Sequence, residues 1–211
     1  LFNNYNIPKI IDGRKLFIKN GRHPVVEETL TLVSDYTPND CQLDDGNIWL
    51  ITGPNMAGKS TFLRQNAIII ILAQTGLFVP AEKAEIGLVD KIFSRVGASD
   101  NLSQGQSTFM VEMMETASIL NRATEKSFII FDEVGRGTST YDGLAIAWAI
   151  LEYLLEKLKS KVLFATHYHE LTSLNKKSRQ IENYKMEIKE WNNEIIFLYK
   201  IVQGEANKSV S

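Results

Sequence analysis

The sequence predicts an α/β domain in which helices flank a mainly parallel core sheet and antiparallel strands lie at the edges. Apolar runs of strand length alternate with longer helical patterns through the middle of the chain. Such alternation is typical of parallel strands joined by helical crossovers. Short or alternating apolar patterns at both ends of the chain favour antiparallel strands there.

The first 45 residues are weakly patterned. Short apolar pairs, Ile10-Ile11 and Val25-Val26, are separated by turn signals at Asp12-Gly13, Asn20-Gly21 and Pro38-Asn39. Paired turn residues of this kind punctuate short extended segments. We therefore expect short strands or edge structure here.

Four apolar runs in the middle of the chain have the length of strands buried on both faces, which lack polar alternation because neither face meets water. They are Ile48–Thr52, Ile92–Val96, Phe128–Phe131 and Val162–Ala165. Helical patterns are expected at Lys59–Thr75, Thr108–Ala123, Thr140–Leu158 and Tyr168–Leu174. In the second of these helices, Met113, Met114 and Ile119 are expected in the core.

The segment Gln180–Val202 alternates apolar and polar residues on both sides of Trp191-Asn192-Asn193. This pattern predicts an antiparallel hairpin. With 211 residues, the chain has the length of one domain. We expect that domain to comprise N-terminal strands over 1–45, a core over 46–175 and the hairpin region over 176–211.

The composition excludes several classes of protein. The formal net charge of −2 argues against a broad basic face for nucleic acid. The single cysteine, Cys41, excludes a disulfide framework and a multi-cysteine zinc site. The longest apolar runs are far shorter than the roughly 20 residues of a membrane span, so a cytoplasmic protein without membrane contact is expected. Because the chain does not begin with Met, we expect it to be a piece of a longer protein.

The run Gly53-Pro54-Asn55-Met56-Ala57-Gly58-Lys59-Ser60 fits the pattern G-x-x-x-x-G-K-[ST] between an expected strand and an expected helix. Glycines let backbone N–H groups surround a phosphate chain at close range. Lys59 is expected to contact the β- and γ-phosphates, and the Ser60 hydroxyl to bind Mg²⁺. The alternative is a plain glycine-containing turn, which the flanking strand and helix disfavour.

Two acidic residues, Asp132 and Glu133, end the third buried strand. Asp132 is placed to hold Mg²⁺ through its water shell. Glu133 is placed to orient or deprotonate an attacking water. Taken alone, the pair is equally compatible with a solvated turn, and the phosphate-binding motif favours the metal and catalytic roles.

His167 follows the fourth buried strand, at the edge where ligands bind in open α/β sheets. It is placed to hydrogen-bond a γ-phosphate. A capping or surface histidine is the alternative.

These motifs together resemble one family. The runs TGPNMAGKSTFLRQ (52–65), SQGQSTFMVEM (103–113), FDEVGRGTSTYDG (131–143), ATHYHEL (165–171) and GRHPVVE (21–27) are similar to the C-terminal ATPase domain of the MutS family of DNA mismatch-repair proteins. That family belongs to the ABC-type P-loop NTPases. Transporter members of the superfamily carry an LSGGQ-type signature where this chain has Gly105-Gln106-Ser107-Thr108, which disfavours a transporter subunit. The tail, residues 208–211, departs from the family pattern.

The resemblance implies ATP or ADP with Mg²⁺ as ligands. It implies nucleotide contacts from Gly53, Pro54, Asn55, Met56, Ala57, Gly58, Lys59, Ser60 and Thr61, a metal site at Ser60 and Asp132, and catalytic roles for Glu133, His167 and Lys59. It places Tyr36 on the adenine and Tyr199 as a second neighbour of the base. Ser107 is expected to reach the γ-phosphate bound by a partner copy, and residues 137–140 to carry signals between the two sites.

The resemblance also implies partners: a second copy of this domain, mismatched DNA contacted by other domains of a full-length protein, and a MutL-type repair protein. The main hypothesis is therefore an ATP-hydrolysing domain that couples its ATP state to mismatch recognition through a dimeric composite site. The alternative is a nucleotide-binding and dimerisation module with negligible turnover.

Overall fold

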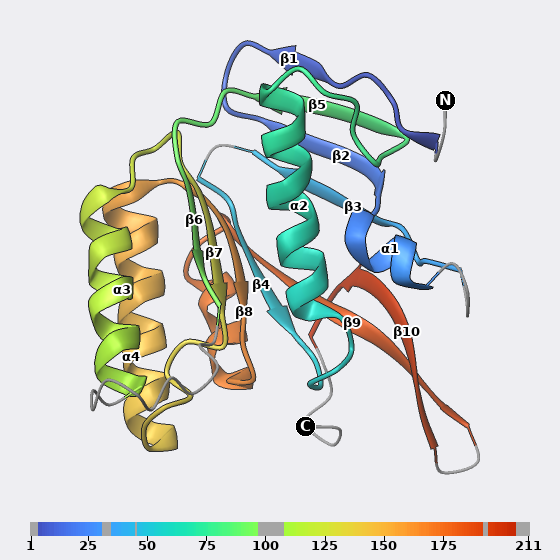
Figure 1. Cartoon of the computed structure of the whole chain (residues 1–211). Coiled ribbons are helices and arrows are strands. Elements are labelled where there is room, and N and C mark those ends of the chain that lie inside the picture. The colour runs from blue at the N-terminus through green and yellow to red at the C-terminus, as the bar shows by residue number, and fades with distance from the viewer. Residues whose placement is uncertain (1–3, 31–34, 45, 97–107, 192–193, 206–211) are drawn as a thin grey trace.

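The computed structural model describes residues 4–30, 35–44, 46–96, 108–191 and 194–205. Two sheets and three long helices are stacked in layers (Figure 1). One helix, α2 (Lys59–Gln74), lies between the two sheets, and α3 (Thr108–Arg122) and α4 (Thr140–Tyr153) cover the far face of the larger sheet. The mixed α/β class is therefore confirmed.

The larger sheet has the strand order β10-β9-β4-β8-β7-β6. Its strands are β4 (Ile48–Thr52), β6 (Ile92–Arg95), β7 (Phe128–Asp132), β8 (Lys161–Ala165), β9 (Ile181–Trp191) and β10 (Glu194–Gln203). Neighbouring strands from β9 to β6 are parallel, and β9 and β10 form an antiparallel pair. The expected parallel core and C-terminal hairpin are both present.

The N-terminal strands were expected at the edge of this core sheet. They form a second sheet instead. Its order is β1-β5-β2-β3, with β1 (Lys9–Ile11), β2 (Leu16–Gly21), β3 (Asn39–Leu43) and β5 (Lys83–Gly87). Strand β5 was not predicted, because its five residues carry too little alternation to stand out. It pairs parallel with β1 and antiparallel with β2, so it completes the sheet from the middle of the chain.

A short helix also escaped prediction. The segment Pro24–Leu30 forms α1, where strand or edge structure was expected. Proline suits the first position of a helix because its missing N–H has no intrahelical partner there. The Nδ1 atom of His23 accepts a hydrogen bond from the N–H of Val26 at 3.3 Å and so caps this turn.

The later helices differ in detail from the prediction. Helix α4 ends at Tyr153 and continues as a π-helical turn over Leu154–Leu158, which stops at Lys159 in the left-handed region with φ of 51°. A 3₁₀ helix, His169–Lys176, stands where an α-helix was expected after β8.

Alternate residues of the core strands belong to two hydrophobic clusters. Trp49 and Ile51 of β4 pack toward α2 and the second sheet, whereas Ile48 and Leu50 pack toward α3 and α4. This explains the continuous apolar runs, since each face of the sheet is covered. On α3, Ile119 is buried as expected, but the expectation for Met114 is wrong because its side chain is 57% exposed.

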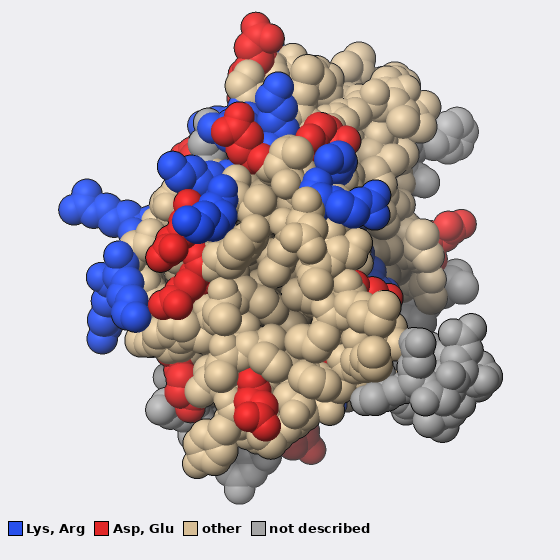
Figure 2. Space-filling view, turned by 90° about the vertical axis from the view of Figure 1, so that its left-hand side faces the viewer, with Lys and Arg blue, Asp and Glu red and all other residues tan. Residues whose placement is uncertain are grey.

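The face formed by α3 and α4 carries mixed charge. Figure 2 shows Lys and Arg side chains interspersed with Asp and Glu over this face, with a broad uncharged area below them. Within the described residues, no helix is both long and apolar enough to cross a membrane.

The start of α4 depends on an unusually close approach of two glycines. A Cβ atom added to Gly135 would lie 2.7 Å from the carbonyl oxygen of Gly143, and one added to Gly143 would overlap the Tyr168 hydroxyl and the Gly135 carbonyl. The Tyr168 hydroxyl donates to the Gly135 oxygen at 3.0 Å. The loop after β7 is thus packed directly onto the first turn of α4.

Gly143→Ala should therefore lower the free energy of unfolding by about 2 kcal/mol, the cost of overpacking, although alanine is usually the better helix former by about 1 kcal/mol. Urea denaturation measures this difference. Ala145→Gly, at an exposed position of the same helix, is the reference for helix propensity. A more stable Gly143→Ala protein contradicts the close approach.

Candidate nucleotide-binding site

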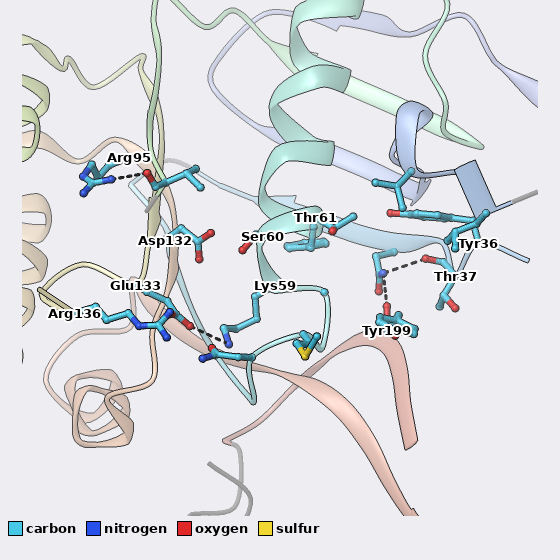
Figure 3. A pocket seen from close by; sticks show the side chains of 18 of the residues that line it. Tyr36, Thr37, Lys59, Ser60, Thr61, Arg95, Asp132, Glu133, Arg136 and Tyr199 are labelled. Atoms are coloured by element: carbon cyan, nitrogen blue, oxygen red, sulfur yellow. Dashed lines mark hydrogen bonds and ion pairs between the residues drawn. The ribbon is translucent and has the colours of Figure 1, made fainter. Parts of the chain in front are cut away.

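A pocket of about 1130 Å³ opens where β4 and β7 end and α2 begins. Its walls come from α1, the segment before β3, the loop and first turn that begin α2, and the end of β6. The N-terminal half of α3, the end of β7 with the loop after it, and Tyr199 on β10 complete them. Figure 3 shows Lys59, Ser60, Asp132 and Glu133 at one end of the pocket and Tyr36, Thr37 and Tyr199 at the other. Residues far apart in the sequence therefore meet in one cavity.

The loop between β4 and α2 depends on glycines with positive φ. Gly53 has φ of 138° and Gly58, which caps α2, has φ of 96°. A Cβ atom at Gly53 would lie 3.2 Å from the Cβ of Met186, and one at Gly58 would lie 3.2 Å from Cδ1 of Tyr199. Both positions thus combine a backbone conformation that favours glycine with a tight approach.

Most of the predicted loop residues line the pocket. Asn55, Met56, Gly58, Lys59, Ser60 and Thr61 do so. Gly53, Pro54 and Ala57 do not lie on the pocket wall but form the backbone behind it.

The amino group of Lys59 is enclosed by oxygen atoms. Its Nζ donates to the carbonyl oxygens of Gly53 at 2.6 Å and Pro54 at 3.0 Å, and lies 3.5 Å from Oε1 of Glu133. Burial lowers the pKa of Lys59 from its ordinary value, and Glu133 opposes this effect. A charged lysine is thereby held at the end of the pocket that also contains both acidic residues.

Asp132 ends β7 as a buried carboxylate. Burial raises the pKa of Asp132, opposed chiefly by a hydrogen bond from the Ser60 side chain. Its Oδ1 atom is buried and makes no hydrogen bond within the protein. A carboxylate oxygen without a partner, next to a serine hydroxyl, suits a hard divalent cation, so these two side chains fit the Mg²⁺ expected from the sequence.

Glu133 adopts φ of 55°, a left-handed conformation uncommon for residues other than glycine. Its N–H donates to the carbonyl of Ala165 on β8 at 2.9 Å. Its carboxylate contacts two cations, Lys59 at 3.5 Å and Nη1 of Arg136 at 2.8 Å. The turn of the backbone after Asp132 thus directs consecutive acidic side chains to different partners.

The backbone behind Glu133 is held by a group that the sequence analysis missed. Oε1 of Glu112, on α3, accepts a hydrogen bond from the N–H of Gly135 at 2.6 Å, and Oε2 lies 3.8 Å from Nη2 of Arg95. Both charged side chains are almost completely buried. The only sequence signal was a glutamate within the apolar stripe of a helix. Arg136, also missed, lies three residues after Glu133 and lines the pocket.

His167 lies close to this end without lining the pocket. Burial lowers its pKa from the ordinary value, and Glu133, Arg136 and Lys59 are its charged neighbours. Its ring packs against Tyr168 with centroids 4.1 Å apart. Ser107 lies outside the described residues.

Tyr36 and Tyr199 line the opposite end of the pocket. The Tyr36 hydroxyl donates to Oε1 of Gln65 on α2 at 2.8 Å and accepts from the backbone of His23. Burial raises the pKa of Tyr36 to about 12. The ring is therefore fixed from behind, with its polar atom turned to the protein.

The strand, glycine loop and helix over 48–74, with two acidic residues ending a parallel strand nearby, define the class of α/β P-loop nucleotide-binding folds. Residues 49–211 match the family model for MutS domain V. The chain belongs to the MutS family, as the resemblance of its motifs indicated.

Its curated relatives are several times longer. The chain is 60% identical to the DNA mismatch repair protein MutS of Caldicellulosiruptor saccharolyticus over 211 residues, 98% of this chain and 24% of that protein. It is 58% identical to the protein of the same name from Thermodesulfovibrio yellowstonii over 212 residues, 98% of this chain and 25% of that protein. The chain thus spans about a quarter of the length of the relatives it matches.

Asp132→Asn should stabilise the protein in the absence of nucleotide, by on the order of 1 kcal/mol at neutral pH, because it removes a buried charge. The raised pKa of Asp132 means that the native state binds more protons than the unfolded state between pH 3.8 and that raised pKa. The unfolding free energy of the wild type should then fall relative to the variant as pH rises through this raised pKa. Urea denaturation at several pH values measures the difference, with exposed Asp44→Asn as control. A difference that shrinks with rising pH contradicts the assignment.

Proposed function

We propose that this chain is an ATP-binding and ATP-hydrolysing domain, corresponding to the C-terminal ATPase domain of MutS-type mismatch-repair proteins. One observation carries the proposal: a buried lysine, a serine–aspartate pair suited to Mg²⁺ and a second carboxylate meet at one end of a pocket. Two tyrosines line its other end. A pocket with a cationic and metal-binding end and an aromatic end is complementary to a nucleoside triphosphate.

Each residue has a definite part in this proposal. Lys59 binds the β- and γ-phosphate oxygens, with backbone N–H groups of the glycine loop and the side chains of Asn55 and Thr61 beside it. Ser60 and Asp132 hold Mg²⁺, which neutralises charge on the phosphates when it is bound. Glu133 orients the attacking water and accepts its proton. His167 contacts the γ-phosphate, and Tyr36 and Tyr199 stack on the adenine.

The proposal extends to assembly. Two copies would enclose two nucleotides, with Ser107 of each copy completing the other copy's site. Residues 137–140 would carry the signal between sites. Mismatched DNA would be bound by other parts of a full-length cytoplasmic protein, which is consistent with the mixed charge on the face in Figure 2. A MutL-type protein would respond to the ATP-bound state.

One observation supports the alternative of a nucleotide-binding and dimerisation module with negligible turnover. The two carboxylate oxygens of Glu133 are paired with Lys59 and Arg136. These two ion pairs fix the orientation of the carboxylate. Hydrolysis then requires these pairs to rearrange, as contact with a second copy would allow.

Glu133→Gln should lower ATP hydrolysis at least about 100-fold, the usual range for removal of a general base. ATP affinity should change by less than about threefold, because Lys59 keeps its contacts with the loop carbonyls. Phosphate release and equilibrium titration measure the two quantities. Lys59→Ala is the matched variant and should instead weaken ATP binding by about tenfold or more. Hydrolysis by Glu133→Gln at the wild-type rate contradicts the catalytic assignment.

Hydrolysis per molecule should rise with protein concentration if the site is completed by a second copy. The experiment is a series of rates over about two decades of protein concentration, with sedimentation in the presence of a non-hydrolysable ATP analogue to detect dimers. A low rate that does not change with concentration favours the module.

A further inference from the structure

Strand β10 is distorted where it enters the pocket. Its pairing with β9 shifts register between Phe197 and Ile201, and Tyr199, between them, has φ of 53°. A bulky residue in the left-handed region costs roughly 1–2 kcal/mol. Other contacts must therefore hold Tyr199 in this conformation.

Those contacts come from Asn39, the first residue of β3 in the other sheet. Its Nδ2 donates to the carbonyl oxygens of Tyr199 at 2.9 Å and Thr37 at 3.3 Å. Its Oδ1 accepts from the N–H of Ile201 at 2.8 Å. Asn39 is only 3% exposed although it lines the pocket. One amide side chain thus bonds to the backbone of Tyr199 within the bulge and of Ile201 at its end.

A second contact joins the same two segments. Nζ of Lys200 donates to the carbonyl oxygen of Pro38 at 2.6 Å. The segment before β3 and the bulge of β10 are therefore joined through residues 38 and 39. Figure 3 shows Thr37 and Tyr199 beside each other, with Tyr36 at the same end of the pocket.

The bulge determines where the Tyr199 ring lies. Its Cδ1 is 3.2 Å from the position that a Cβ would take at Gly58, so the ring rests against the glycine that begins α2. The position of the Tyr199 ring relative to the glycine loop is thus fixed by this contact. Without the Asn39 hydrogen bonds, the strand could regain regular pairing, which would turn this side chain away.

We propose that Asn39 is a positioning residue that fixes Tyr199 as one wall of the base subsite and does not itself read the base. Both N–H groups of its amide are used within the protein. The hydroxyl of Tyr36 is likewise bonded to Gln65. Neither the Asn39 amide N–H groups nor the Tyr36 hydroxyl proton is therefore free to bond the edge of a base. This inference rests on the proposed nucleotide binding.

The test compares ATP with inorganic tripolyphosphate, which lacks the base and ribose. The dissociation constant for tripolyphosphate divided by that for ATP, both measured with Mg²⁺ by calorimetry, isolates the contribution of the nucleoside. Asn39→Ala should lower this ratio about tenfold, the effect of one lost base–aromatic contact. GTP affinity should fall by the same factor as ATP affinity, because Asn39 acts through the Tyr199 ring and does not itself read the base edge.

A second variant distinguishes loss of the Tyr199 hydrogen bond from general loss of folding. Asn39→Asp keeps the shape and the acceptor for Ile201 but cannot donate to Tyr199. Its added charge affects both ligands and largely cancels in the ratio, which should fall as for Asn39→Ala. In a Tyr199→Ala background, either change should lower the ratio no further. Asn47→Ala is the matched control, since it removes a hydrogen bond to Glu182 of β9 far from the pocket and should leave the ratio unchanged.

The outcomes are distinct. If the wild type binds neither ligand, the proposed function fails. If the wild type prefers ATP and the Asn39 variants keep the full ratio, Asn39 does not position Tyr199. An ATP loss that exceeds the GTP loss shows that Asn39 reads the base edge and overturns the inference. Additive losses with Tyr199→Ala also overturn it.

Discussion

The buried ammonium of Lys59 is the constraint on which most of the site depends. An ammonium removed from water needs oxygen partners at short range. Two come from the glycine loop, at Gly53 and Pro54, and the third from Glu133. Gly53, which supplies the first of these carbonyls, has φ of 138°. The Glu133 carboxylate lies within reach of Lys59 because only β8 separates β4, which leads to the loop, from β7, which leads to Glu133.

The position of Glu133 depends in turn on hydrogen bonds made by the backbone two residues later, at Gly135. Its left-handed backbone is followed by Gly135, whose N–H is bound by Glu112 of α3 and whose carbonyl is bound by Tyr168 after β8. Each of these partners comes from a different element. A displacement of α3 would therefore reach the Glu133 loop through one buried hydrogen bond of 2.6 Å. Helix α3 also reaches the pocket wall, at Thr108 and Glu112, so one helix contacts both the pocket and this loop.

Much of the core and the lysine end of the pocket could be predicted from sequence, because local patterns encode them. The apolar run Ile48–Thr52 and the glycine motif after it give the strand, loop and helix directly, and Asp132 is recognisable as an acid that ends a buried strand. The second sheet could not be predicted in this way. Strand β5 has five residues and owes its place to pairing with β1 and β2, which are far away in sequence. Asn39 and Glu112 are polar residues at buried positions, and only the folded chain reveals which backbone groups they satisfy.

Helix α2 relates the two ends of the pocket. Lys59, Ser60 and Thr61 lie in its first turn, at one end of the pocket. Gln65, about 9 Å further along the helix axis, is fully buried and accepts the hydroxyl hydrogen bond of Tyr36. An α-helix has a fixed rise per residue, so backbone geometry determines the separation between Lys59 and the Tyr36 end of the pocket. The second sheet, which carries Asn39, then holds the opposite tyrosine against the start of this helix. The pocket is thus built around a single helix, with one sheet supplying the acidic residues and the other fixing the aromatic end.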